Sequence, residues 1–220
     1  MKELVKTLIK HTPLYGPLRH ALATIRSRRA LKSWERQGRP IPPPAPVKQA
    51  IVKHYAEQFS IRSFVETGTL WGDMVYANKN IFQKIFSIEL DQSLYERAKN
   101  RFSNDAHISI LQGDSGEVIA KVLDKIDEPC LFWLDGHYSG GITAKGKLET
   151  PIVQELNDIL NHSIHEHVIL IDDARHFVGQ NDYPTIEELK QLILKHNPGW
   201  VFEVKHDVIR ACKNGKNQYS

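Results

Sequence analysis

Residues 64–73, "FVETGTLWGD", decide the fold of this chain of 220 residues. A short apolar run ends at Glu66, and Gly68 and Gly72 then allow a tight turn before a helix begins. Two glycines in such a loop are a weak signal by themselves, because an ordinary strand-to-helix turn can also contain them. The pattern gains weight because apolar runs and helical stretches alternate along the rest of the chain.

Further apolar runs predict strands after the first one, which we place at residues 61–66. They cover residues 84–89, 107–111, 130–135 and 167–172. Near the C-terminus, residues 199–213 predict a strand, a tight turn near His206 and Asp207, and a returning strand. The alternation predicts an α/β fold with a doubly wound, mostly parallel seven-stranded sheet, in which one C-terminal strand runs antiparallel.

Several helix starts are visible between these strands. Asp91 is placed to cap the helix that follows it, and Asp114 with Glu117 resembles a capping box. Thr185 and Glu188 form a clear capping box. A further helix is expected to open at Thr150-Pro151, because proline is favoured in a first helical turn.

The first 46 residues differ from the rest of the chain. Residues 1–40 contain ten Lys and Arg and two acids, a charge of +8, whereas the whole chain carries +3, which leaves −5 for residues 41–220. Apolar spacing predicts helical pieces, and five prolines between 40 and 46 predict an extended linker. We therefore place a basic helical arm and linker at 1–46, and the main domain at 47–220, beginning with a helix over 47–59.

Composition restricts the class of protein. The chain is 41% hydrophobic and 25% charged, and no apolar run approaches the roughly 18–20 residues that span a bilayer. The two cysteines, Cys130 and Cys212, lack metal-type spacing and indicate buried thiols in a reducing compartment. We expect a cytoplasmic protein, with the basic arm lying against the inner membrane surface as an alternative.

Ligands of an open α/β sheet bind beyond the carboxyl ends of the strands. The segments that follow the apolar runs are "ETGTLWGD", "ELD", "GDS", "DGHYSGG" and "DDARHF", all polar, acidic or glycine-rich. Glu89 ends the second strand about 20 residues after the glycine loop, a spacing suited to binding ribose hydroxyls. Asp114 serves equally well as a helix cap or as a neighbour of an adenine.

These motifs resemble those of class I S-adenosylmethionine-dependent methyltransferases. "FVETGTLWG", "IFSIELD", "LQGDS" and "LFWLDG" occur in the family's order and spacing, over about residues 50–215. The resemblance implies a Rossmann-like fold and S-adenosylmethionine as cofactor. The implied cofactor-binding residues are Glu66, Thr67, Gly68, Thr69 and Gly72 of the loop, Glu89 at the ribose, Asp114 and Ser115 near the adenine, and Asp135. One departure is Leu70, which replaces the middle glycine of the usual loop and restricts the backbone conformations that the loop can adopt.

Three aspartates end the fourth and fifth strands. Asp135 follows one run, and Asp172 and Asp173 follow the other. Neighbouring strands lie about 4.8 Å apart, so the three carboxylates can converge, and they repel unless a positive charge lies between them. Oxygen ligands without cysteine favour Mg²⁺ over Mn²⁺ or Ca²⁺. The alternative is that Asp172 or Asp173 only caps a turn.

The segment "LDGHYSGG", followed by "ILIDD", resembles the metal-dependent O-methyltransferases that modify sugars of natural products and bacterial glycans. A bound divalent cation would make a sugar hydroxyl more acidic, and Asp135 and a histidine base would complete the catalytic set. His137 is the first candidate for this base and His176 the second. For each, the alternative is a solvent-exposed loop histidine.

The loop over residues 139–150 is long and glycine-rich, so it is either a lid over the substrate or a surface insertion. Its Lys145 and Lys147 favour an anionic acceptor, such as a nucleotide-sugar or an acidic glycan. The basic arm is open to three interpretations: contact with an anionic membrane, binding of RNA, or contact with a second subunit in a homo-oligomer. Its apolar face and the lack of interleaved aromatics disfavour nucleic acid.

The sequence therefore predicts an S-adenosylmethionine-dependent, Mg²⁺-dependent O-methyltransferase that acts on a hydroxyl of a sugar or glycan. One alternative is a methyltransferase of RNA or of another small molecule that uses the basic arm to bind its acceptor. Another is a scaffold that binds the cofactor without catalysis. Acidic or glycine-bearing residues at all five strand ends disfavour the scaffold.

Overall fold

The computed structural model describes residues 15–136 and 150–214, with side chains from residue 25 onward. The chain divides into two compact units, Met1–Lys48 and Gln49–Ser220. His137 and the predicted lid up to residue 149 lie outside the described residues, as does the helical piece expected within residues 1–14.

The first unit contains the long helix α2 (Tyr15–Arg36). The basic residues in the part of α2 whose side chains are described are all exposed: Arg26, Arg28, Arg29, Lys32 and Arg36. At the end of the helix, the indole Nε1 of Trp34 donates to the carbonyl oxygen of Pro40 at 2.7 Å. The following helix, α3 (Ala45–Gln58), begins two residues before the predicted residue 47. Pro46 can stand there because a first-turn residue needs no intrahelical N–H bond.

The second unit is built around one seven-stranded sheet with the order β3-β2-β1-β4-β5-β7-β6. Its strands are β1 (Ser63–Thr67), β2 (Lys84–Glu89), β3 (Ile108–Gln112), β4 (Cys130–Leu134), β5 (Val168–Ile171), β6 (Trp200–Lys205) and β7 (Val208–Lys213). Strands β1 to β5 pair in parallel, whereas β7 runs antiparallel to both β5 and β6. The predicted Rossmann-like sheet with an antiparallel C-terminal strand is confirmed.

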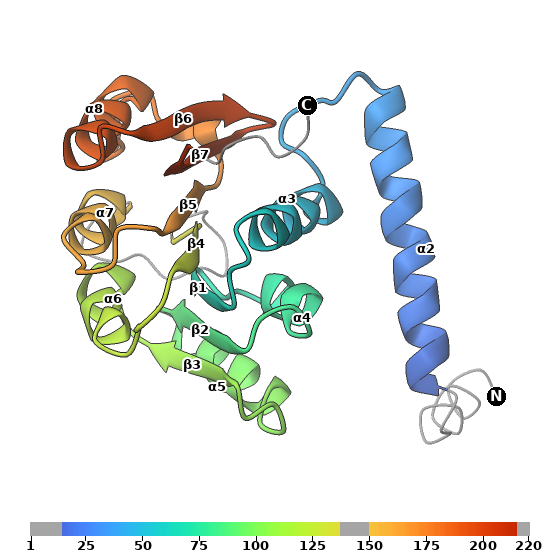
Figure 1. The fold of residues 1–220 in the computed structure, drawn as a ribbon. Coiled ribbons are helices and arrows are strands. Elements are labelled where there is room, and N and C mark those ends of the chain that lie inside the picture. The colour runs from blue at the N-terminus through green and yellow to red at the C-terminus, as the bar shows by residue number, and fades with distance from the viewer. Residues whose placement is uncertain (1–14, 137–149, 215–220) are drawn as a thin grey trace. The chain divides into compact units, whose positions relative to one another are not determined.

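Helices cover both faces of this sheet. They are α4 (Asp73–Asn78), α5 (Gln92–Arg101), α6 (Ser115–Leu123), α7 (Ile152–Leu160) and α8 (Ile186–His196), with a short 3₁₀ turn η1 (Ala174–His176). Figure 1 shows α3, α4 and α5 on one face and α6, α7 and α8 on the other. Strands β1, β4 and β5 are buried along their whole length, which explains why they appear in the sequence as continuous apolar runs.

The predicted helix starts rest on specific hydrogen bonds. Asp91 accepts from the amide of Leu94 at 2.9 Å, and Asp114 accepts from the amide of Gly116 at 3.0 Å. Thr185 and Glu188 form the reciprocal capping box at the start of α8. The helix α7 begins at Ile152, directly after the predicted start at Thr150-Pro151, and Thr150 Oγ1 accepts from the amide of Ile152 at 3.4 Å.

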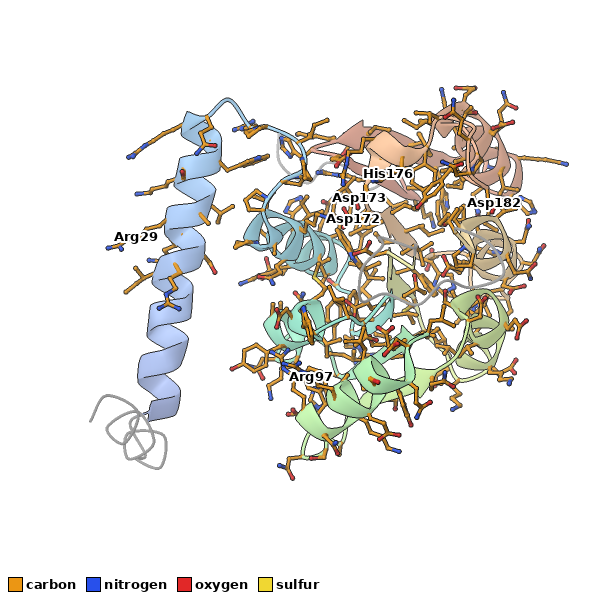
Figure 2. All side chains as sticks on the ribbon, turned by 180° about the vertical axis from the view of Figure 1, so that it is seen from behind. Arg29, Arg97, Asp172, Asp173, His176 and Asp182 are labelled. Carbon is orange, nitrogen blue, oxygen red and sulfur yellow. The ribbon has the colours of Figure 1, made fainter. Side chains whose placement is uncertain are left out.

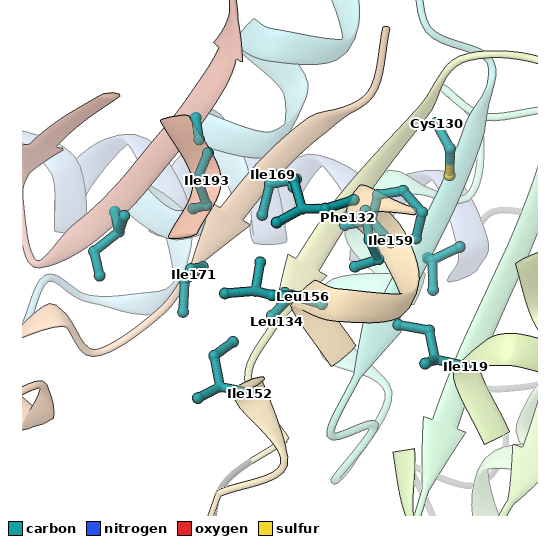
Figure 3. Close-up of a cluster of buried hydrophobic side chains, with 14 of the residues drawn as sticks. Ile119, Cys130, Phe132, Leu134, Ile152, Leu156, Ile159, Ile169, Ile171 and Ile193 are labelled. Atoms are coloured by element: carbon teal, nitrogen blue, oxygen red, sulfur yellow. The ribbon is translucent and has the colours of Figure 1, made fainter. Parts of the chain in front are cut away.

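One large cluster of core residues lies between the sheet and the layer formed by α6, α7 and α8. Figure 3 shows its centre, where Phe132 and Leu134 of β4 and Ile169 of β5 meet Leu156 and Ile159 of α7. Each of these five side chains is at most 2% exposed. Burial of one such side chain stabilises the fold by about 1.5–3 kcal/mol, so this layer holds the carboxyl ends of β4 and β5 in fixed positions.

Candidate functional site

The order of the strands reverses between β1 and β4, which are parallel neighbours, and the glycine loop lies at this point. β1 pairs with β2 on one side and with β4 on the other, with Thr67 opposite both Ile88 and Leu134. Gly68 has φ +86°, and a Cβ added there would lie 2.5 Å from the carbonyl oxygen of Asp135. Only glycine allows this approach of the loop to the end of β4. A ligand of such a sheet is expected beyond the carboxyl ends of β1 and β4, next to the glycine loop, and we call this region the crevice.

Leu70 occupies the position at which the loop departs from the usual glycine pattern. Its φ is +49°, a left-handed conformation that costs a non-glycine residue about 1–2 kcal/mol. Its amide donates to Oε2 of Glu89 at 2.7 Å, and the amide of Asp91 donates to Oε1 of the same carboxylate at 3.0 Å. Glu89 therefore fixes the glycine loop from the end of β2, and the loop keeps the glycine-like backbone despite the leucine.

Glu66 lies beneath the loop and is only 2% exposed. The hydroxyl of Ser87 donates to its Oε2 at 2.5 Å, and the hydroxyls of Ser87 and Thr69 are 2.6 Å apart. Burial raises the pKa of Glu66 well above its usual value, the hydrogen bond from Ser87 opposes this, and the nearby carboxylates of Asp135 and Glu89 raise it further. A cationic ligand in the crevice would offset this repulsion.

The remaining predicted cofactor residues surround the same crevice. Gly72, with φ 71°, is the N-cap residue of α4. Thr67 Oγ1 accepts from the amide of Asp135 at 3.2 Å, which ties the end of β1 to the end of β4. Asp114 caps α6, and Ser115, 7% exposed, is the first residue of that helix. The cap interpretation of Asp114 holds, and its contact with an adenine stays a prediction.

The three aspartates do converge. Ligand oxygens of Asp135, Asp172 and Asp173 all lie within 4.8 Å of one another. The backbone sets this arrangement, because the amide of Asp172 donates to the carbonyl of Leu134 at 3.0 Å and so holds the ends of β4 and β5 level. Figure 2 shows Asp172 and Asp173 side by side beyond β5, with His176 next to them. Three oxygen donors at this spacing fit a hard divalent cation.

Arg175 also belongs to this cluster, and the sequence analysis missed it. Its guanidinium donates to Oδ1 of Asp173 at 2.7 Å and to the carboxylate of Asp207 in the turn between β6 and β7. Burial lowers the pKa of Arg175, but its bonds to Asp173 and Asp207 outweigh this effect and raise it. Part of the negative charge at the end of β5 is therefore offset within the protein.

The two predicted histidine bases differ in what the structure says of them. His137 lies outside the described residues. His176 is exposed at the end of η1, one turn beyond Asp173, and its ring lies 5.8 Å from the ring of Tyr183. His176 is thus near the aspartate cluster, and its role as a base stays a prediction.

Glu155 is a second residue that the sequence analysis missed. It lies in the first turn of α7, fully buried, beside Thr67, Ser115 and Gly136. Burial raises its pKa to about 7, although the nearby hydroxyls of Ser115 and Thr67 lower it. A signal was present in the sequence: Glu155 falls on the apolar face of α7, three residues after Ile152 and four before Ile159.

Two cavities flank the ring of Tyr183. One, of about 10 Å³, lies between the strand ends and α7, and its polar lining includes Asp135, Thr150, Glu155 and Asp172. The other, of about 510 Å³, opens at the surface beside α7 and α8. Its lining includes Gln180, Asn181, Asp182, Tyr183 and Glu188, and none of the described lining residues is basic.

No family model matches the chain, and no curated protein matches it either. Solved structures do match, at low sequence identity. An O-methyltransferase from Bacillus cereus in complex with SAH is 11% identical with a TM-score of 0.56, covering 85% of this chain and 90% of that one. A putative caffeoyl-CoA O-methyltransferase from Staphylococcus aureus is 13% identical with a TM-score of 0.54, covering 91% and 100%.

A third similar structure is the O-methyltransferase TomG from Streptomyces achromogenes, involved in tomaymycin synthesis, in complex with SAM. It is 13% identical with a TM-score of 0.52, covering 86% of this chain and 89% of that chain. At such identities the likeness concerns the fold. These methyltransferase structures and this chain share the Rossmann-like fold, which agrees with the predicted fold class. No described helix is long and apolar enough to cross a membrane.

Proposed function

We propose that the protein is an S-adenosylmethionine-dependent O-methyltransferase that uses Mg²⁺ and acts on a hydroxyl of a sugar or glycan. The observation that carries the proposal is the convergence of three carboxylates at the ends of β4 and β5, directly beside the glycine loop. A methyl donor and an oxygen-bound divalent cation would thus occupy adjacent positions. Such proximity favours transfer of the methyl group to a hydroxyl bound at the cation.

The residues of the crevice fit the cofactor. The backbone at Gly68 would lie along its methionine part. Glu89 would bind the ribose hydroxyls in place of the amides of Leu70 and Asp91, and Ser115 would lie near the adenine. The acidic surroundings of Glu66 suit a sulfonium better than a phosphate. When bound, S-adenosylmethionine supplies the methyl group that is transferred.

The aspartate cluster would hold the cation. Asp135 and Asp172 provide carboxylates from adjacent strand ends, and Asp173 provides a carboxylate of which one oxygen bonds to Arg175. When bound, Mg²⁺ supplies Lewis acidity that makes an acceptor hydroxyl easier to deprotonate. His137 or His176 would take that proton, because a neutral imidazole is a competent base near pH 7.

The cavity of about 510 Å³ supports a polyhydroxylated acceptor. Amide and carboxylate side chains beside an aromatic ring form the kind of surface that hydroxyl groups can bind, and Tyr183 joins this cavity to the aspartate cluster. Asp182 and Glu188 favour a neutral or amino sugar at this point. Lys145 and Lys147, outside the described residues, were the reason for expecting an anionic one.

Calorimetry tests the cofactor, and turnover with sugars, nucleotide-sugars and glycolipids, measured as release of the demethylated cofactor, tests the reaction. Absence of S-adenosylmethionine binding at millimolar concentration would refute the proposal. Full turnover in EDTA would show that the reaction needs no divalent metal, and the three aspartates would then have a structural role. His137→Ala should retain cofactor affinity and lose rate, whereas normal turnover would exclude His137 as the base.

For the basic arm we propose peripheral contact with an anionic membrane, where glycolipid acceptors would lie. The exposed basic residues of α2 support this assignment. Binding to vesicles with 30% anionic lipid, compared between the full chain and a variant with Arg26, Arg28 and Arg29 changed to Gln, tests it. Equal binding of both proteins would contradict it, and a gel shift with RNA would favour the alternative that the arm binds an RNA acceptor.

A further inference from the structure

Glu155 is a buried acid that the proposed mechanism does not use. Its side chain has no exposed surface, and neither carboxylate oxygen has a partner in hydrogen-bonding geometry among the described residues. Burial of a carboxyl group without a partner is costly, and such groups are rare in folded proteins. A leucine at this position would extend the apolar face of α7. The presence of the acid therefore needs an explanation.

Three segments of the crevice meet at this carboxyl group. A Cβ added to Gly136 would lie 3.2 Å from Glu155 Oε1, 3.0 Å from Thr67 Oγ1 and 2.9 Å from Ser115 Oγ. Thr67 ends β1, Ser115 begins α6, and Gly136 follows β4. The lack of a side chain at Gly136 is what lets the acid from α7 approach the two hydroxyls.

The hydroxyl of Thr67 is placed to donate a hydrogen bond to Glu155. It accepts a hydrogen bond from the amide of Asp135 at 3.2 Å, so its own proton is left to donate elsewhere. The Glu155 carboxylate is the nearby acceptor, and the hydroxyl of Ser115 can donate to the same group. A small rotation of either hydroxyl-bearing side chain completes these bonds.

The cavity beside Glu155 is too small to admit the acceptor itself. The cavity that joins Glu155 to Asp135 and Asp172 has a volume of about 10 Å³, room for a single water at most. Glu155 must therefore act through the protein groups around it.

We propose that Glu155 is a positioning residue: by accepting from the hydroxyls of Thr67 and Ser115, it fixes the backbone at Asp135 and the start of α6 in the geometry that the cofactor needs. The effect on cofactor binding rests on the proposed function. The hydrogen bonds from Thr67 and Ser115, and the backbone position that they fix, do not depend on it. The alternative is that Glu155 is tolerated in the core without any effect on the crevice.

The test compares Glu155→Leu and Glu155→Gln with the matched control Asp158→Asn, one turn further along α7. Calorimetry gives the dissociation constant of S-adenosylmethionine, and urea unfolding gives stability. Glu155→Leu should weaken cofactor binding tenfold or more while the protein stays folded, because both hydroxyls lose their acceptor. Glu155→Gln should lose less, about threefold, because its Oε1 still accepts from one hydroxyl. Asp158→Asn should bind like the wild type.

A double-mutant cycle with Thr67→Val shows whether Glu155 acts through the hydroxyl of Thr67. If Glu155 acts through Thr67 as well as Ser115, Glu155→Leu should weaken binding clearly less in the Thr67→Val background than in the wild type. Independent, multiplying effects would overturn the proposal, as would wild-type affinity in both Glu155 variants. Should Glu155→Leu fail to fold, the Gln variant decides, and an affinity equal to that of the wild type would overturn the proposal.

Amide hydrogen exchange of Asp135 in the free protein separates the two proposals. Faster exchange in the Glu155 variants, with no change in Asp158→Asn, supports the positioning role even if the wild type binds no cofactor. In that case the proposed function alone has failed. If amide exchange and cofactor binding are both unchanged in the Glu155 variants, Glu155 has no effect on the crevice. The proposed function would then be unaffected.

Discussion

His167 should make the protein less stable as the pH falls below neutrality. The ring is 2% exposed at the start of β5, and its Nδ1 accepts from the amide of Cys130 at 3.1 Å. A neutral imidazole with an accepting Nδ1 carries its proton on Nε2, which here faces Nδ1 of His162 at 3.0 Å. The native structure therefore holds His167 in its neutral form.

Burial, with smaller contributions from the neighbouring His162 and His165, lowers the pKa of His167 from 6.5 to about 4. Between these pH values the unfolded chain binds a proton that the folded chain does not. Stability is thus full above pH 6.5 and falls as the pH drops toward 4. A tenfold change in proton affinity is worth about 1.4 kcal/mol, so the complete loss is about 3 kcal/mol, and about 2.5 kcal/mol of it appears between pH 7.5 and 4.5.

His167→Asn isolates this effect, because the Oδ1 of asparagine can still accept from Cys130 and the side chain does not titrate. At pH 7.5 the variant should be less stable by about 1–2 kcal/mol, since the ring contact with Phe132 at 5.1 Å is lost. At pH 4.5 the wild type should have lost about 2.5 kcal/mol relative to the variant. Other titrating groups are common to both proteins and cancel in the difference.

Urea unfolding at four pH values from 4.5 to 7.5 measures the difference, with His165→Asn as the control because His165 is exposed in the same loop. The control should keep most of the pH dependence of the wild type, because the burial of His167, the largest cause of its lowered pKa, is unchanged. Parallel curves for the wild type and His167→Asn would refute the reasoning. They would show that the proton on His167 is bound equally well in both states.

Three further predictions concern the crevice. Gly136→Ala should destabilise the protein by about 1–3 kcal/mol in urea, because the new methyl group meets Thr67, Ser115 and Glu155, whereas Gly199→Ala, with open space around it, should change little. Asp172→Asn should weaken Mg²⁺ binding at least tenfold by calorimetry; unchanged affinity would contradict the cluster's role. Arg175→Met should tighten Mg²⁺ binding several-fold, because the guanidinium no longer competes for Asp173; weaker binding would indicate that Arg175 orders the carboxylate.

The elements that the sequence predicted best are those whose signals are local. The strand at residues 84–89 was placed to the residue, since it is a buried apolar run with a charged residue at each end. The capping box of Thr185 and Glu188 likewise depends only on residues three apart. The first strand was placed two residues early, because Ile61 is a buried residue just before the sheet begins. Its hydrophobicity cannot be distinguished from that of a strand residue.

The candidate site was predictable as far as strand ends reveal it. Parallel strands bring their carboxyl ends to one edge, so the sequence alone groups Asp135, Asp172 and Asp173. Arg175 could not be assigned in this way, because its partner Asp207 lies in the turn between β6 and β7, 32 residues away. Such a pair depends on the position of β7 beside β5, which no local pattern gives.

The balance of positive and negative charges at the end of β5 favours a metal centre over a turn that is held only by ion pairs. Arg175 carries one positive charge and divides it between Asp173 and Asp207. That single charge does not balance the further carboxylates of Asp135 and Asp172, whose oxygens lie within 4.8 Å of that of Asp173. A divalent cation would supply further positive charge, and removal of Arg175 would increase the need for it. A turn held only by its ion pairs would instead lose stability on that substitution without gaining any affinity for Mg²⁺.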